Sequence, residues 1–111
     1  MSSNILEGVI VPDNMVRDFM YTHDGAVAAG EIHDVGNTFA SMGLDLFVRN
    51  RGAAAITVAI NGQPAVTVDP GDVYILNQTK FWLITVVSAV LYDFQIFGIK
   101  ITTLKQRGLM K

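Results

Sequence analysis

Two histidine–aspartate pairs, His23-Asp24 and His33-Asp34, are the residues of the N-terminal third whose types suit metal binding or acid–base chemistry. A zinc site needs three or four converging ligands, and two imidazoles with flanking carboxylates would supply them if the segment folded back on itself. Each pair also stands beside a glycine that favours a turn, Gly25 or Gly36. Because solvated turn residues are the commoner role for such pairs, we expect no metal and no cofactor.

The other common arrangements for catalysis are missing from the sequence. The chain has no cysteine, which removes disulfides, thiolate nucleophiles and cysteine-ligated metals. It has no G-x-S-x-G motif, no P-loop and no dinucleotide fingerprint, and its glycines are dispersed at turns. The body also has few acids for the paired carboxylates of glycoside hydrolysis. We therefore expect that the protein is not an enzyme.

The segment DPGD at 69–72 resembles the Pro-Gly-Asp turn that recurs in cupin domains. Cupin enzymes hold their metal with an H-x-H pair followed by later Glu and His residues. This chain has no H-x-H pair and no histidine after His33, so the resemblance implies no metal-dependent activity. Proline and glycine at the two central positions of a type II turn explain the segment without a ligand.

Four aromatic residues offer a different function, the stacking of a sugar ring on a flat platform, as in carbohydrate-binding sandwiches. Aromatic side chains at alternating strand positions more often fill a core. A carbohydrate-binding module that recognises a host surface is therefore our alternative function. The four residues are Tyr74, Phe81, Trp82 and Tyr92.

Alternating apolar and polar residues predict the elements that must position these side chains. Segment 43–50 places Leu44, Leu46 and Val48 on one face, which is typical of a half-buried strand. Asn61-Gly62 between two such runs predicts a tight hairpin. Six or seven short strands without a long helix predict an all-β fold, an antiparallel β-sandwich that is jelly-roll-like or a small barrel. The predicted strands are 43–50, 54–60, 65–68, 73–76, 81–87 and 90–99.

The 111 residues have room for one domain, with an arm and a tail. We expect an extended N-terminal arm over residues 1–30, a β-sandwich domain over 31–100 and a terminal strand or tail over 101–111. Residues 8–11 and 17–21 are typical of short extended pieces, although Met15, Phe19 and Met20 at helical spacing could instead form one short helix in the arm. The chain is acidic up to Asp45 and basic after Phe94. These ends could either join neighbouring copies or pack side by side in one chain.

Composition narrows the classes of partner. Half of the residues are hydrophobic and 16% are charged, which excludes intrinsic disorder. A net charge of −2 argues against a nucleic-acid binder. The longest apolar stretch, 81–91, has 11 residues, whereas a membrane helix needs about 20. The N-terminus has no signal-peptide pattern. Together, these observations predict that neither a membrane nor a nucleic acid is a partner.

The apolar content exceeds what a small two-layered domain can enclose. A domain of this size buries about two-thirds of its unfolded surface, and several strands carry apolar residues on both faces. Exposed apolar patches on a small domain indicate interaction surfaces, so we expect a homo-oligomer or docking on a larger assembly. The candidate interface residues are Phe47, Trp82, Phe97, Ile99 and Leu104.

The segments GLDLFVRN, AITVAING, PAVTVDPGDVY and LITVVSAVLYDFQIFGIK together resemble the small β-sandwich virion proteins of tailed bacteriophages. The resemblance covers roughly residues 31–100. It implies a structural protein without catalysis, made in the host cytoplasm and located in the virion. Such a protein decorates or cements the capsid as a homo-oligomer bound to the major capsid protein or another virion protein. By the same resemblance, residues 1–30 and 101–111 would reach neighbouring subunits.

Overall fold

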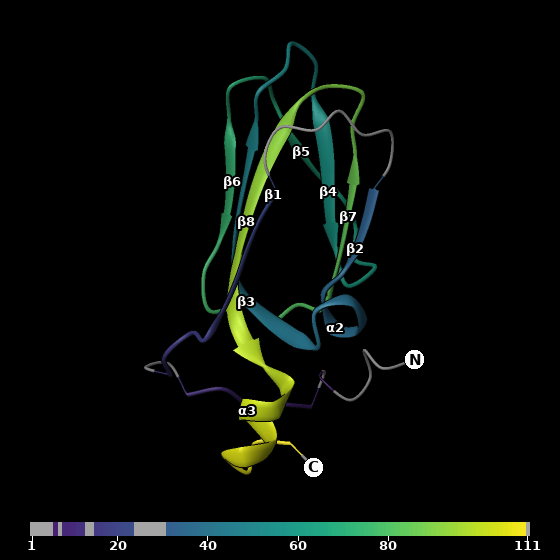
Figure 1. Cartoon of the computed structure of the whole chain (residues 1–111). Coiled ribbons are helices and arrows are strands. Elements are labelled where there is room, and N and C mark those ends of the chain that lie inside the picture. Colours follow the sequence, from purple (N-terminus) through teal and green to yellow (C-terminus); the bar gives the residue numbers. More distant parts are fainter. Residues whose placement is uncertain (1–5, 7, 13–14, 24–30, 111) are drawn as a thin grey trace.

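The structure, a computed structural model, describes residues 6, 8–12, 15–23 and 31–110. Two antiparallel four-stranded sheets pack face to face, which confirms the predicted all-β sandwich (Figure 1). Sheet I has the order β1-β8-β3-β6, and its strands are Phe19–His23, Tyr92–Lys100, Ser41–Asn50 and Val73–Leu76. Sheet II has the order β2-β7-β4-β5, and its strands are Glu31–Asp34, Leu83–Val87, Ile56–Ile60 and Val66–Val68. Two short helices are also described, α2 (Val35–Thr38) and α3 (Ile101–Gln106).

The strands pair as one long antiparallel hairpin that has been rolled into two layers. β1 pairs with β8, β2 with β7, β3 with β6 and β4 with β5. The tip of this hairpin is the predicted Asn61-Gly62 turn, whose φ angles are 52° and 72°. A rolled hairpin of eight strands is the jelly-roll arrangement, so the jelly-roll form of the prediction holds rather than the small barrel.

The main core fills the space between the sheets with the apolar side chains that alternate inward along the strands. Four of these side chains are at most 1% exposed: Val48 and Phe94 from sheet I, and Ile84 and Val86 from sheet II. Asn50, the last residue of β3, is also buried, and its amide donates to the carbonyls of Ala54 and Val68 at 2.8 and 3.0 Å. The single buried amide therefore ties three parts of the chain together.

A second core cluster lies below the sheets, where the N-terminal segment meets α3 (Figure 1). Its buried residues are Leu6, Val9, Met15, Met42, Leu44, Ile99 and Leu104. The main-chain nitrogen of Lys100 donates to Asp18 at 2.9 Å, and the Thr103 hydroxyl donates to the same carboxylate. The acidic and basic ends thus pack side by side in one chain.

Two alternatives that the sequence offered for these ends are wrong, the short helix in the arm and the strand in the tail, whereas the extended interpretation around residues 17–21 agrees with β1. Phe19 and Met20 belong to β1 rather than to a helix, because they pair with Gly98 and Phe97 of β8. Residues 19–23 of the expected arm are consequently part of sheet I. The tail forms helix α3 rather than a strand, because its buried Leu104 packs into the second core cluster.

The segment between β6 and β7 pairs with β3 at Phe81. Gly43 and Phe81 exchange two main-chain hydrogen bonds of 2.8 and 2.9 Å. A Cβ on Gly43 would lie 2.2 Å from the Phe81 ring, so only glycine leaves room for that ring. On the other side, a Cβ on Gly98 would meet the Met42 carbonyl oxygen at 2.1 Å. The register of β3 on β8 shifts at this point, between Gly43 and Asp45.

Candidate functional site

The outer face of sheet I carries large apolar side chains at its centre. The β register sets Phe97 between Met20 and Asp45, and it sets Phe47 between Gln95 and Ile75. The exposed fractions of Met20, Phe47 and Ile75 are 61%, 38% and 55%. We call the outward apolar residues of this sheet the sheet I patch: Met20, Phe47, Val73, Ile75 and Phe97.

Two predicted interface residues, Phe47 and Phe97, come together in this patch. Phe97 lies opposite Asp45, two residues before Phe47 on the same strand face, so the two rings are diagonal neighbours within mutual reach. Met20 and Ile75 extend the patch to the two edge strands. Neither residue was predicted from the sequence. The alternation in VYIL, however, already places Ile75 on the other face of the strand from Tyr74 and Leu76.

Two ion pairs border the patch. Arg17 Nε lies 2.8 Å from Asp45 Oδ2, and Arg51 Nη1 lies 3.1 Å from Asp93 Oδ1. Burial alone would raise the pKa of Asp45, but hydrogen bonds from Arg17 and from the main chain of Gln78 hold that pKa below its ordinary value. A partner could cover the apolar centre without leaving these carboxylates unpaired, and a polar rim around an apolar centre is typical of protein interfaces.

Ile99 and Leu104 are not available to a partner, which corrects the sequence-based prediction for both. Each has 0% exposure and belongs to the second core cluster. Ile99 points to the same face of β8 as Phe97, but the N-terminal segment and α3 cover this end of the sheet. Trp82 is half-buried against the same cluster and lies apart from the sheet I patch.

The outer face of sheet II has a different character. Its outward strand residues are small or aliphatic, and the only charged one in the described strands is Asp34, whose carboxylate accepts hydrogen bonds from Asn37 at the start of α2. Ile32 is 67% exposed on this face, on edge strand β2. The other outward residues are Thr57, Ala59, Thr67, Leu83, Thr85 and Val87. The two faces therefore allow a direct experimental comparison.

The four aromatic residues considered for sugar stacking do not share one exposed surface. Phe81 and Tyr92 have 0% exposure. Tyr74 packs partly against the main core, and Trp82 packs against the second core cluster. The arrangement gives no open stacking platform, so no observation here favours the carbohydrate-binding alternative.

The two histidines lie inside the sandwich rather than in solvated turns. His23 and His33 come from β1 and β2, and their ring centroids are 5.6 Å apart. The His33 Nε2 atom lies 3.1 Å from Glu31 Oε2, and the Tyr92 hydroxyl donates to that same carboxylate oxygen at 3.0 Å. Burial, and secondly the hydrogen bond to Glu31, raise the pKa of Tyr92 well above its ordinary value of 10. We call these four residues the histidine cluster.

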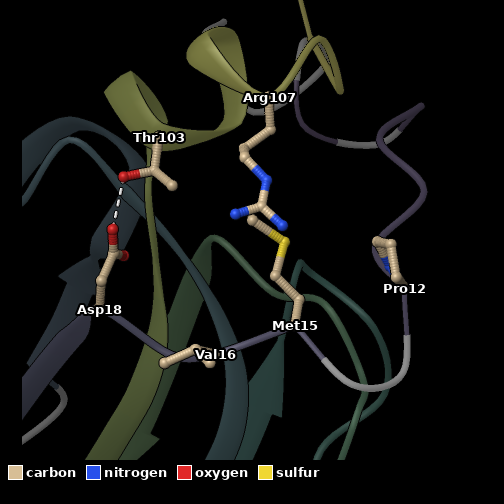
Figure 2. Close-up of a pocket in the computed structure, with 6 residues that line it drawn as sticks. All are labelled: Pro12, Met15, Val16, Asp18, Thr103 and Arg107. Atoms are coloured by element: carbon tan, nitrogen blue, oxygen red, sulfur yellow. Dashed lines mark hydrogen bonds between the residues drawn. The ribbon is translucent and has the colours of Figure 1, made fainter.

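A pocket of about 360 Å³ opens between the N-terminal segment and α3 (Figure 2). Its walls are Pro12, Met15 and Val16 on one side and Thr103 and Arg107 on the other, and the Arg107 side chain reaches toward Met15. Asp18 at its margin is already bonded to Lys100 and Thr103, and these bonds lower its pKa although burial raises it. The pocket marks where the two ends of the chain meet.

Comparison with models of known families, with curated proteins and with solved structures gave no match. Within the described residues, no group of three or more His, Cys, Asp or Glu side chains is arranged to hold a metal ion. Across the same part of the chain, no helix has the length and apolar character needed to cross a membrane. The sheet I patch remains the best-formed candidate for function.

Proposed function

We propose that this chain is a non-enzymatic structural protein of a viral particle, a capsid decoration or cement protein that self-associates and stabilises the assembly. The resemblance of residues 31–100 to small virion sandwiches supports the setting. Jelly rolls are frequent among viral capsid proteins, although lectins and cupins share the fold, so the fold alone does not decide between these functions.

The observation that carries the proposal is the sheet I patch. A sheet with one solvated face ordinarily places polar residues outward, whereas here Met20, Phe47 and Ile75 point outward with 38% to 61% of their surface exposed. Burial of such side chains contributes about 25 cal/mol per Å² of apolar surface, from which the cost of ordering two chains is subtracted. Many copies on a symmetric shell would add their individually weak contacts.

The test compares the same substitution on the two faces of the sandwich. Ile75→Lys places a charge in the sheet I patch, and Ile32→Lys places it on the outer face of sheet II. Both residues lie on edge strands, and they are 55% and 67% exposed. Sedimentation velocity on the wild-type chain and both variants, over a wide range of concentration, measures self-association directly.

The expected result is an associating wild-type chain, an Ile32→Lys variant that associates equally and an Ile75→Lys variant that is monomeric. A wild-type chain that stays monomeric at millimolar concentration would contradict self-association. Equal association of all three would show that the contact lies elsewhere. Circular dichroism of the variants confirms that the sandwich is intact before either result is interpreted.

A further inference from the structure

The histidine cluster lies between two edge strands, one from each sheet, that do not pair with one another. β1 is an edge of sheet I and β2 is an edge of sheet II, and in the described strands β1 pairs with β8 and β2 with β7. The contact between these edges is therefore made by side chains. His23 and His33, 5.6 Å apart, form that contact at the end of β1.

The packing of both rings suits neutral imidazoles. His23 stacks on Phe94 at 4.9 Å and on Tyr92 at 5.1 Å, and its Nε2 atom is buried without a hydrogen-bond partner among the described residues. The His33 ring packs on Phe94 at 4.5 Å. A proton on each ring would place two like charges in this aromatic setting, one of them on a nitrogen with no acceptor among those residues.

One carboxylate is present to offset those charges. Glu31 faces His33 from the same strand, and Tyr92 faces both imidazoles from β8 as a hydroxyl donor. β7 presents only the aliphatic Ile84 and Val86 inward, and Tyr21 is the other titratable side chain facing this interior from β1. Asp34 and Asp93 point to the outer faces, where Asn37 and Arg51 bind them.

The direction of titration at His33 agrees with this geometry. Burial lowers its pKa below the ordinary value of 6.5, and the neighbouring His23 lowers it further, whereas Glu31 acts in the opposite direction. The chain has two histidines and no cysteine, so between pH 8 and pH 5 no other type of side chain ordinarily titrates. The α-amino group also titrates in this range, so a histidine variant is needed to assign a change of structure to this cluster.

We propose that the His23–His33 contact is an acid-sensitive latch that holds β1 against β2, and that protonation of both imidazoles releases β1 from sheet I. One consequence rests on the proposed function. Met20 lies on β1, so release of this strand removes an exposed side chain from the sheet I patch. Self-association then weakens in acid.

Amide hydrogen exchange on the full chain tests the latch. Exchange is followed from pH 8 to pH 5, and the rates are corrected for the intrinsic effect of pH on exchange. Below pH 6.5 the opening constant of β1 amides should rise as the pH falls, because opening lets the buried imidazoles bind protons. The amides of β4, in the interior of sheet II, should stay protected and serve as the internal control.

His23→Phe is the informative variant, because it keeps a stacked ring and removes one titrating group. The opening constant of its β1 amides should rise less steeply with falling pH than that of the wild-type chain. An imidazole proton titration of the wild-type chain by NMR gives a second readout, in which uptake of the second proton coincides with the loss of β1 protection. This readout keeps the proposal falsifiable if the variant folds poorly.

Three results would overturn the latch: β1 protection that does not depend on pH, an unchanged slope in His23→Phe, or simultaneous loss of protection in β1 and β4. Sedimentation at pH 8 and pH 5.5 separates this proposal from the function. A chain that is monomeric at both pH values but shows the expected slopes would contradict self-association and leave the latch supported.

Discussion

Gly43→Ala perturbs the bridge between β3 and the Phe81 segment, and its cost follows from the geometry. The new Cβ would lie 2.2 Å from two atoms of the Phe81 ring, so the ring must move by more than 1 Å to reach ordinary contact, roughly 3.5 to 4 Å. Such overpacking costs about 1–3 kcal/mol. Because glycine within a strand is itself unfavourable by about 0.5–1 kcal/mol, we expect a net loss of about 1–2 kcal/mol.

A double-mutant cycle with Phe81→Leu assigns that loss to the ring. Phe81→Leu alone should cost about 1–2 kcal/mol for the buried volume removed. The smaller leucine side chain leaves room for the methyl group that Gly43→Ala adds. The free energy of unfolding lost in the double variant should therefore be smaller than the sum of the two single losses by at least about 1 kcal/mol. Chemical denaturation followed by Trp82 fluorescence measures all four free energies of unfolding.

Gly71→Ala provides the matched control. Gly71 has a φ of 81° with nothing near its Cβ position, so the substitution strains the turn without touching the core. Its loss should be additive with that of Phe81→Leu. Additive losses for Gly43→Ala and Phe81→Leu as well would refute the assignment of the clash to this ring.

Three further substitutions test individual buried contacts. Asn50→Ala removes the bonds to the Ala54 and Val68 carbonyls and should lower the free energy of unfolding by about 2–4 kcal/mol in denaturant titrations. Arg17→Leu removes a hydrogen-bond donor to Asp45. The lowered pKa of Asp45 stabilises the fold at pH values above the ordinary pKa of an aspartate, and this stabilisation is lost as the pH falls through the lowered pKa. The melting temperature should therefore fall less steeply between pH 6 and pH 3 in the variant than in the wild-type chain. In Tyr92→Phe, absorbance titration should lose one phenol that resists ionisation well above pH 10.

The strands of the sandwich could be predicted wherever apolar residues point inward. Segment 43–50 and the Asn61-Gly62 turn follow the alternation and the positive φ that the residues favour. The β2 strand reverses this rule, because Glu31 and His33 point into the sandwich and Ile32 points outward. If the alternation is interpreted by hydrophobicity alone, the face of such a strand that carries Ile32 is wrongly assigned to the interior.

The candidate site could be predicted in part. Phe47 and Phe97 follow directly from apolar residues on the second face of a strand. Ile99 has the same parity as Phe97, but its burial depends on Leu6, Val9 and Leu104, which come from both ends of the chain. Strand parity carries no information about such distant segments. His23 and His33 were named from the sequence, but their grouping with Glu31 and Tyr92 was not, since Tyr92 is 59 residues from its neighbour His33.

The claim that copies of the chain meet through the sheet I patch is tested most directly by photo-crosslinking from within it. A benzophenone amino acid replaces Phe47 in one sample and Ile32 in another, and each sample is irradiated at a concentration where the chain associates. We predict a dimer-sized product from position 47 only, with the crosslink mapped to β1, β3, β6 or β8 of the second copy. Dimers formed from position 32 alone, or from neither position, would contradict the claim.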